Sequence, residues 1–261
     1  MTSRAKSDKE RLDVILVERG LAESRQKAQA MILAGEVRVS GQRADKAGTK
    51  IARDAGIELS GGPTRYVGRG GLKLEGALGE FGIHPEGRVC LDAGSSTGGF
   101  TDCLLQHGAA RVYAVDVTTS QLAWKLRQDA RVVPIEANIR YLDAKALSEP
   151  PSLVTADVSF ISVAKVLPRL AAVAAPGAEF LVLVKPQFEL ERGDVGRGGI
   201  VRDTQLHERA IERVRVAAGL AGLEVRGVKP SRVLGAEGNQ EFFLHAVLTA
   251  PNSGPAGKSV G

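Results

Sequence analysis

The stretch Cys90-Leu91-Asp92-Ala93-Gly94-Ser95-Ser96-Thr97-Gly98-Gly99-Phe100 decides the fold of this chain. Residues 89–91 predict a buried parallel strand that ends in an acid, and three glycines then allow a tight turn where the backbone can approach a ligand. A predicted helix over residues 100–106 follows the turn directly. Open α/β sheets bind nucleotides in the crevice at the carboxyl end of such a strand, so the stretch predicts a cofactor site.

The pattern of acids and glycines narrows the choice of nucleotide. A dinucleotide fingerprint reads G-x-G-x-x-G, whereas this turn reads D-x-G-x-x-x-G-G. Asp92 would repel a pyrophosphate and attract a cationic ligand such as S-adenosylmethionine. A second apolar strand, residues 111–116, ends in Asp116, which is placed to accept hydrogen bonds from ribose hydroxyls. Either acid alone is more often a cap or turn residue, but together with the glycine turn they favour the cofactor.

The composition is typical of a globular protein, and its excess of basic residues permits a polyanionic partner without requiring one. The 261 residues are 43% hydrophobic, which suffices for a core, and 35 Lys and Arg against 30 Asp and Glu give a formal charge of +5. The basic excess is concentrated at the N-terminus, because residues 1–61 hold twelve basic and nine acidic side chains.

Cysteine, histidine and hydropathy patterns favour a reduced, metal-free, cytoplasmic protein. Cys90 and Cys103 lie in apolar contexts typical of buried thiols, and the four histidines show no ligand spacing, so we expect no metal. The charged N-terminus has no apolar signal region, and no uncharged run of eighteen apolar residues occurs.

Strands and helices alternate from residue 88 onward, which predicts an α/β domain of the Rossmann-like type with a doubly wound, mostly parallel sheet. Later strands are predicted at 132–135, 153–158, 180–184, 223–228 and 242–248, and helices at 120–127, 163–174 and 206–221. Residues 191–199 are glycine-rich and charged and predict a mobile loop. We expect a flexible N-terminus (1–9), a small α+β domain (10–60), a linker (61–68), the large domain (69–249) and a disordered tail (250–261).

The N-terminal domain carries a moderately specific pattern. Helices are predicted over residues 11–19 and from Ser24 to about Gly35, followed by a strand over 36–39 and a turn. The order of residues over 10–60 resembles the alpha-L RNA-binding domain. The resemblance implies contact with structured RNA through the backbone phosphates, and the candidate contacts are Arg11, Arg25, Lys27, Arg38 and Arg43. A solvated basic surface is the alternative for any such charge pattern.

Four charged residues stand at strand ends or beside glycines: Lys73, Asp157, Lys185 and Glu241. Lys185 directly ends the apolar run 180–184, which puts its charge at the rim of the cofactor crevice. The alternative for Lys185 is a surface lysine whose aliphatic stem is buried. For each of the other three, a structural role and a functional role have about equal weight.

These four residues match, in order and context, the Lys-Asp-Lys-Glu tetrad of ribose 2′-O-methyltransferases of the FtsJ type. With the alpha-L domain in front, the chain to about residue 249 resembles the TlyA family, also called haemolysin A proteins, which methylate ribosomal RNA. The strings that carry the resemblance are Arg69-Gly70-Gly71-Leu72-Lys73-Leu74, Asp92 to Thr101, Asp157-Val158-Ser159-Phe160-Ile161-Ser162 and Val184-Lys185-Pro186-Gln187-Phe188-Glu189.

The resemblance implies transfer of a methyl group from S-adenosylmethionine to a ribose 2′-hydroxyl of ribosomal RNA, at a cytidine. It implies a catalytic role for the tetrad and an RNA contact for Arg69. The implied cofactor contacts are Asp92, Gly94, Ser95, Ser96, Thr97, Gly98, Gly99, Phe100, Asp116, Val117, Asn138 and Asp157. A lysine can take the hydroxyl proton only if its pKa falls towards neutrality, which a second lysine nearby favours. Lys185 is our choice for the residue nearest the hydroxyl, and the sequence leaves open whether it or Lys73 is the base.

Two other functions are considered for this sequence, and its linker and tail differ from those of some family members. A pore-forming haemolysin would need a membrane-inserting stretch, and the sequence has none. A non-catalytic ribosome-assembly factor would not need the tetrad. Members that modify both ribosomal subunits share a linker tetrapeptide with Trp and a C-terminal helix, whereas this chain has Thr64-Arg65-Tyr66-Val67 and a Gly/Pro-containing tail. Subunit choice, nucleotide identity and oligomeric state stay open.

Overall fold

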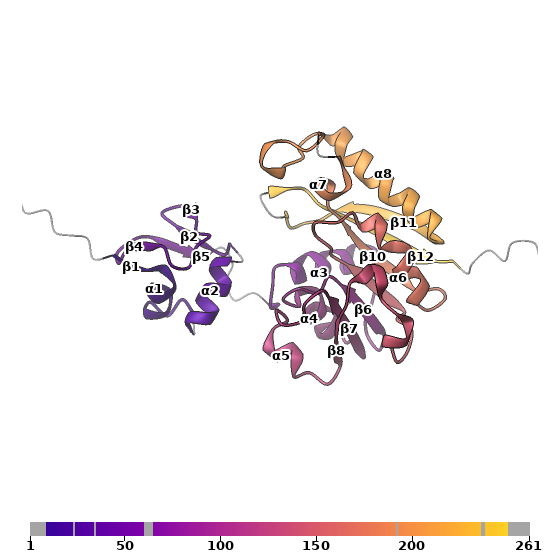
Figure 1. The fold of residues 1–261 in the computed structure, drawn as a ribbon, viewed down its shortest axis with the longest axis horizontal. Coiled ribbons are helices and arrows are strands. Elements are labelled where there is room, and N and C mark those ends of the chain that lie inside the picture. Colours follow the sequence, from indigo (N-terminus) through magenta and orange to yellow (C-terminus); the bar gives the residue numbers. More distant parts are fainter. Residues whose placement is uncertain are drawn as a thin grey trace, which may run out of the picture. The chain divides into compact units, whose positions relative to one another are not determined.

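A computed structural model describes residues 9–22, 24–33, 35–59, 65–191, 193–235 and 238–249 (Figure 1). The chain divides into two compact units, Met1–Thr64 and Arg65–Gly261. The predicted disordered tail, most of the predicted flexible N-terminus and residues 61–64 of the predicted linker lie outside the described residues.

The first unit packs two short helices against short antiparallel strands. Its elements are β1 (Lys9–Arg11), α1 (Leu12–Glu18), α2 (Arg25–Leu33), β2 (Val37–Val39), β3 (Gln42–Arg43), β4 (Lys50–Ala52) and β5 (Ile57–Leu59). Strand β1 pairs with β4, and β2 pairs with β3 and β5. Lys9, predicted to be flexible, faces Ala52 in the β1–β4 ladder. Ser24 caps α2 as predicted, because its Oγ accepts a hydrogen bond from the backbone N–H of Lys27 at 3.2 Å.

The second unit is built on one mostly parallel sheet. Among the described residues its strands are β6 (Val89–Ala93), β7 (Arg111–Asp116), β8 (Val132–Glu136), β9 (Leu153–Ala156), β10 (Glu179–Val184), β11 (Leu223–Pro230) and β12 (Phe242–Leu248). Their order is β11-β12-β10-β9-β6-β7-β8. Strand β12 runs antiparallel to both of its neighbours, and the other six strands run in one direction. The chain order reverses between β6 and β9, which is the switch point where such sheets bind ligands.

Helices cover both faces of this sheet (Figure 1). They are α3 (Gly70–Phe81), α4 (Gly99–Gln106), α5 (Trp124–Arg127), α6 (Leu167–Val173), α7 (Pro186–Glu189) and α8 (Thr204–Leu220), with 3₁₀ turns at Ile139–Tyr141, Ala144–Ala146, Val163–Lys165 and Arg197–Gly199. Alternate residues of β10 enter different cores. Phe180 and Val182 pack with α6 and α8, whereas Leu181 packs with α3 and α4. The sheet is therefore doubly wound, as predicted.

Two predicted helices are shorter than expected. The helix predicted over 120–127 begins only at Trp124, because the backbone N–H and hydroxyl of Thr119 both bond to Glu136 and hold the preceding residues in a turn. The helix predicted over 163–174 is a 3₁₀ turn followed by α6, which has Pro168 in its first turn. Proline has no N–H to donate and so favours a helix start at that point.

Residues 65–68, predicted as part of the linker, pack on the second unit. The Tyr66 side chain is buried, and the backbone N–H of Val67 donates to Asp102 Oδ2 at 2.8 Å. A Cβ on Gly71 would lie 2.3 Å from the Tyr66 ring, so the glycine is needed for this packing. The segment that leads into α3 is thereby fixed to α4.

Candidate active site

The glycine turn after β6 approaches the backbone that follows β9. Gly94 has a φ of +87°, and a Cβ there would lie 2.3 Å from the carbonyl oxygen of Asp157. Both the backbone conformation and the lack of space therefore require glycine at this position. Ser96 also has a positive φ, and its backbone N–H donates to Asp116 Oδ2 at 2.9 Å. The turn joins the ends of β6, β7 and β9.

A first cavity of about 480 Å³ opens at this edge of the sheet. Of the predicted cofactor residues, it is lined by Gly94, Ser96, Asp116, Val117, Asn138 and Asp157. Its other lining residues are Gln121, Val158, Ser159, Phe160, Ile161, Val166 and Ile139. These seven were not predicted as cofactor contacts, although four of them stand in the string Asp157 to Ser162 that carries the family resemblance.

Asp92 does not line the first cavity. Its side chain is fully buried, and its carboxylate accepts hydrogen bonds from the hydroxyls of Thr101 at 2.7 Å and Thr155 at 3.3 Å. Burial raises the pKa of Asp92 to about 7. These hydrogen bonds to Asp92 link α4 and β9 to the central strand beneath the glycine turn. The sequence had instead predicted that Asp92 faces the ligand directly.

The remaining predicted cofactor residues start helix α4 and do not line the first cavity: Ser95, Thr97, Gly98, Gly99 and Phe100. Gly98 is the N-cap, with a φ of +96°. The Phe100 ring lies in the core, with its centroid 6.1 Å from that of Phe243. These residues shape the turn that presents Gly94 and Ser96.

A second cavity of about 500 Å³ brings the tetrad together, because Lys73, Asp157, Lys185 and Glu241 all line it. It is also lined by Arg69, Gly70, Ser159, Phe160, Gln187, Phe188, Gly199, Leu234 and Asn239. The four residues come from α3, the end of β9, the end of β10 and the start of β12. Residues 168 positions apart in the chain thus meet at one site.

The tetrad forms two ion pairs. Lys73 Nζ lies 2.5 Å from Glu241 Oε2, and Lys185 Nζ lies 2.6 Å from Asp157 Oδ1. The second contact lacks the alignment of a hydrogen bond, which Lys185 instead donates to Ser159 Oγ at 2.8 Å. The Glu241 side chain is 2% exposed, whereas that of Asp157 is 22% exposed. The first pair is therefore deeply buried, and the second reaches solvent.

Comparison with known proteins agrees with this geometry. A family of FtsJ-like methyltransferases matches residues 66–247, and the S4 domain matches residues 10–57. The chain belongs to the FtsJ-like methyltransferase family.

Its relatives extend the match to both units. The 16S/23S rRNA (cytidine-2′-O)-methyltransferase TlyA of Mycobacterium tuberculosis is 48% identical over 236 residues, which cover 90% of this chain and 88% of that protein. Hemolysin A of Brachyspira hyodysenteriae is 44% identical, covering 91% and 100%. A solved structure from Streptococcus thermophilus, described provisionally as a hemolysin, is 45% identical with a TM-score of 0.73, covering 93% and 90%. The predicted membership among TlyA and haemolysin A proteins is confirmed.

In this FtsJ-like methyltransferase the two cavities share one wall, formed by Asp157, Ser159 and Phe160. Phe160 has a φ of +66°, and its side chain is 93% exposed. Its ring centroid lies 5.6 Å from that of Phe188. A positive φ at a bulky residue is strained, and such strain often occurs at functional sites. An exposed aromatic ring beside the tetrad is suited to stacking on an unpaired base.

The predicted RNA contacts of the S4 domain fall into two groups. Arg11 and Arg25 both bind the carboxylate of Asp13, at 2.9 and 3.1 Å. Asp13 is buried, and these partners together with Gln29 hold its pKa well below the usual range. Lys27, Arg38 and Arg43 form the second group; they are exposed and have more freedom to contact a phosphate. Arg69, the predicted RNA contact in the other unit, is exposed at the second cavity.

No group of three or more His, Cys, Asp or Glu side chains suited to a metal occurs among the described residues. Within the same residues, no helix is long and apolar enough to cross a membrane.

Proposed function

We propose that this protein transfers the methyl group of S-adenosylmethionine to a ribose 2′-hydroxyl of ribosomal RNA, at a cytidine. The observation that carries the proposal is the shared wall. Asp157, Ser159 and Phe160 separate a cavity that holds Asp116 and the glycine turn from one that holds the whole tetrad. The activity for which the Mycobacterium tuberculosis relative is named supports the choice of substrate.

The first cavity fits S-adenosylmethionine in its chemistry. The Asp116 carboxylate can accept hydrogen bonds from ribose hydroxyls, and the bare backbone at Gly94 permits close approach. Asn138 lies after β8 and lines the same cavity, where its amide can contact the adenine. When bound, S-adenosylmethionine supplies a methyl group on a positively charged sulfur, which an oxygen nucleophile attacks.

The tetrad can position the hydroxyl and accept its proton. Both lysines line only the second cavity, but Lys185 contacts Asp157 and Ser159, which line both cavities, whereas Lys73 contacts Glu241, which lines only the second. These contacts support Lys185, of the two lysines, as the one nearer the boundary where transfer occurs. In its unprotonated form it takes the hydroxyl proton, and Asp157 stabilises the resulting ammonium. The Lys73–Glu241 pair lines the same cavity and orients the nucleotide there.

The substrate enters from the tetrad side. Phe160 and Phe188 offer aromatic faces there, and Arg69 offers a charge for a phosphate. The S4 domain would add further phosphate contacts. A ribosomal substrate also implies that the protein acts in the cytoplasm.

The test is transfer of radioactive methyl groups to separate 30S and 50S subunits from a strain that lacks the gene, followed by mapping of the modified nucleotide. We expect a cytidine 2′-O-methyl group with the parent protein and at least about a hundredfold slower transfer with Lys185→Ala. Lys229→Ala is the matched control, since Lys229 donates to the carbonyl of Glu80 and lines neither cavity. A parent that methylates neither subunit, while still binding one of them, would favour the assembly-factor alternative.

A further inference from the structure

Glu189 is a buried acid that the mechanism above does not use. It ends α7, four residues after Lys185, and its side chain is 2% exposed. One carboxylate oxygen accepts a hydrogen bond from the backbone N–H of Val163 at 2.7 Å, and the other accepts from the hydroxyl of Ser162. Both partners lie in the segment that follows β9, so the carboxylate joins two segments that are distant in sequence.

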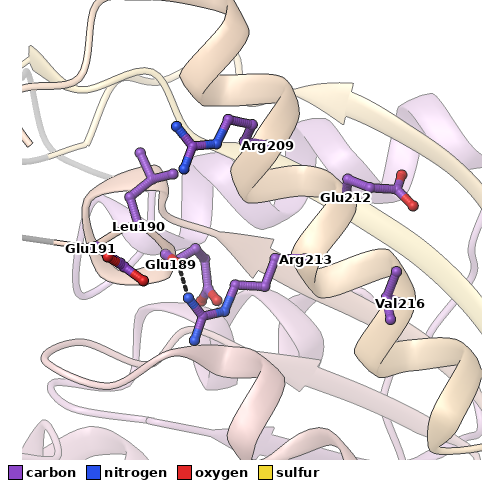
Figure 2. Close-up of a pocket in the computed structure, with 7 residues that line it drawn as sticks. All are labelled: Glu189, Leu190, Glu191, Arg209, Glu212, Arg213 and Val216. Carbon is purple, nitrogen blue, oxygen red and sulfur yellow. Dashed lines mark hydrogen bonds between the residues drawn. The ribbon is translucent and has the colours of Figure 1, made fainter. Parts of the chain in front are cut away.

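The backbone of Glu189 is held from a third element. Arg213 of α8 donates from Nη1 to the carbonyl oxygen of Glu189 at 2.8 Å, as Figure 2 shows. A surface pocket of about 430 Å³ lies over this contact, lined by Glu189, Leu190, Glu191, Arg209, Glu212, Arg213 and Val216. Since Arg213 bonds to the main chain, it fixes the position of Glu189 while leaving both carboxylate oxygens to Ser162 and Val163.

The two joined segments carry the reacting groups. Asp157 and Ser159 precede Ser162 on one segment, and Lys185 precedes Glu189 on the other. Contacts between the segments at the cavity itself are the ion pair from Lys185 to Asp157, its hydrogen bond to Ser159 and the ring contact of Phe160 with Phe188. A lysine on a long side chain fixes two loops weakly. The buried carboxylate, with two charge-assisted hydrogen bonds in a low-dielectric setting, fixes them more firmly.

We propose that Glu189 is a positioning residue for methyl transfer, whose buried carboxylate sets the Asp157–Ser162 segment against Lys185. The inference rests on the proposed function. It assigns no contact between Glu189 and the substrate. Burial raises the pKa of Glu189, and the hydrogen bonds from Ser162 and from the Val163 N–H oppose that shift.

The test compares Glu189→Ala with Glu189→Gln. A glutamine can accept from Val163 N–H through Oε1 and donate from Nε2 to the Ser162 hydroxyl, so both bonds can persist without the charge. We expect Glu189→Ala to lower kcat about a hundredfold, the scale of a misplaced reacting group, with KM for RNA changed less than about threefold. Glu189→Gln should restore kcat to within about threefold of the parent.

Glu179→Ala is the control for lost stability. Glu179 begins β10, the strand that leads to Lys185 and α7, and it binds Arg88 and His245, away from both cavities. It should lower the melting temperature and leave kcat unchanged at a temperature where circular dichroism shows every variant folded. A kcat loss that is equal for Glu179→Ala and Glu189→Ala would overturn the inference.

A second measurement separates this inference from the proposed function. Because the Asp157 segment also lines the first cavity, Glu189→Ala should weaken S-adenosylmethionine binding about fivefold by calorimetry, and Glu189→Gln should restore it. A parent that transfers methyl groups, with Glu189→Ala equal to it in kcat and cofactor affinity, would refute the positioning role alone. A parent that transfers none would refute the proposed function, and the cofactor affinities would still decide whether Glu189 sets the segment.

Discussion

Lys73→Ala should destabilise the second unit far more than Lys185→Ala does. Lys73 lies 2.5 Å from Glu241, which is 2% exposed, so removing the ammonium leaves a carboxylate buried without its counter-ion. Breaking a buried ion pair from one side typically costs about 3–5 kcal/mol. Asp157, the partner of Lys185, is 22% exposed and can be hydrated when its lysine is lost. Lys185→Ala should therefore cost about 1 kcal/mol or less.

The difference is large enough to measure by thermal unfolding. For a unit of this size each kcal/mol shifts Tm by about 2–4 °C, so Lys73→Ala should lower Tm by about 6–20 °C. The double variant Lys73→Met with Glu241→Gln removes both charges and should recover most of that loss, because no uncompensated charge stays buried. Both single lysine variants should still lose at least about a hundredfold in methyl transfer, assayed well below Tm. Equal Tm values for the two single variants would refute the reasoning from burial.

Three further outcomes follow from the geometry. Asp116→Ala should weaken S-adenosylmethionine binding by about 1.5–3 kcal/mol, as measured by calorimetry, and an unchanged affinity would remove the cofactor from the glycine turn. Neutralising Lys27, Arg38 and Arg43 together should reduce the slope of log affinity against log salt for ribosomal RNA by up to about three, and an unchanged slope would exclude these residues as phosphate contacts. Burial raises the pKa of Asp92 to about 7, so in the folded protein Asp92 keeps a proton that the unfolded chain loses above about pH 4. The free energy of unfolding should therefore fall as pH rises from about 4 to 7, by up to about 4 kcal/mol. Asp92→Asn should remove that part of the slope in urea unfolding, and an identical slope in both proteins would contradict the assignment.

The fold and the meeting of the tetrad could be predicted because strand ends obey a simple geometric rule. The carboxyl ends of parallel strands lie at one edge of a sheet, so Asp116, Asp157 and Lys185 were expected together. Lys73 and Glu241 are harder to place, since one lies in α3 and the other precedes an antiparallel strand. Position alone left a structural role equally weighted for both, and the match to the family tetrad favoured a catalytic one; the structure brings both to the second cavity.

The position of the Asp92 side chain depends on where its strand ends, which the residue pattern does not show. The predicted strand ends at Leu91, which would leave Asp92 free to face a ligand. In the structure β6 continues to Ala93, and Asp92 is paired in register with Thr155 on one side and Ala114 on the other. A shift of two residues in the strand end places the carboxylate inside the sheet, beneath α4. Strand boundaries depend on pairing partners that a single sequence does not display.

The S4 domain gives a second example, because two of the arginines predicted to contact phosphates also bind a carboxylate within the domain. Arg11 meets Asp13 locally, whereas the packing of α1 against α2 brings Arg25 to the same carboxylate. An arginine that already satisfies a buried carboxylate has fewer N–H donors left for a phosphate. Counting basic residues therefore overestimates the phosphate contacts of this unit.

Phe160 lies at the wall between the two cavities, where the substrate nucleotide must be held. A ribose hydroxyl reacts only when it is held in line with the methyl group, so the nucleotide must be immobilised at the wall between the cavities. Phe160 is at that wall, is almost fully exposed and carries a strained backbone, which costs stability without burying apolar surface. Phe160→Gly removes both the ring and the steric cost of the positive φ, so it should impair methyl transfer while leaving the second unit as stable in thermal unfolding as before or more so. That combination is the opposite of what an ordinary core phenylalanine would give, and it distinguishes a substrate-holding ring from a packing one.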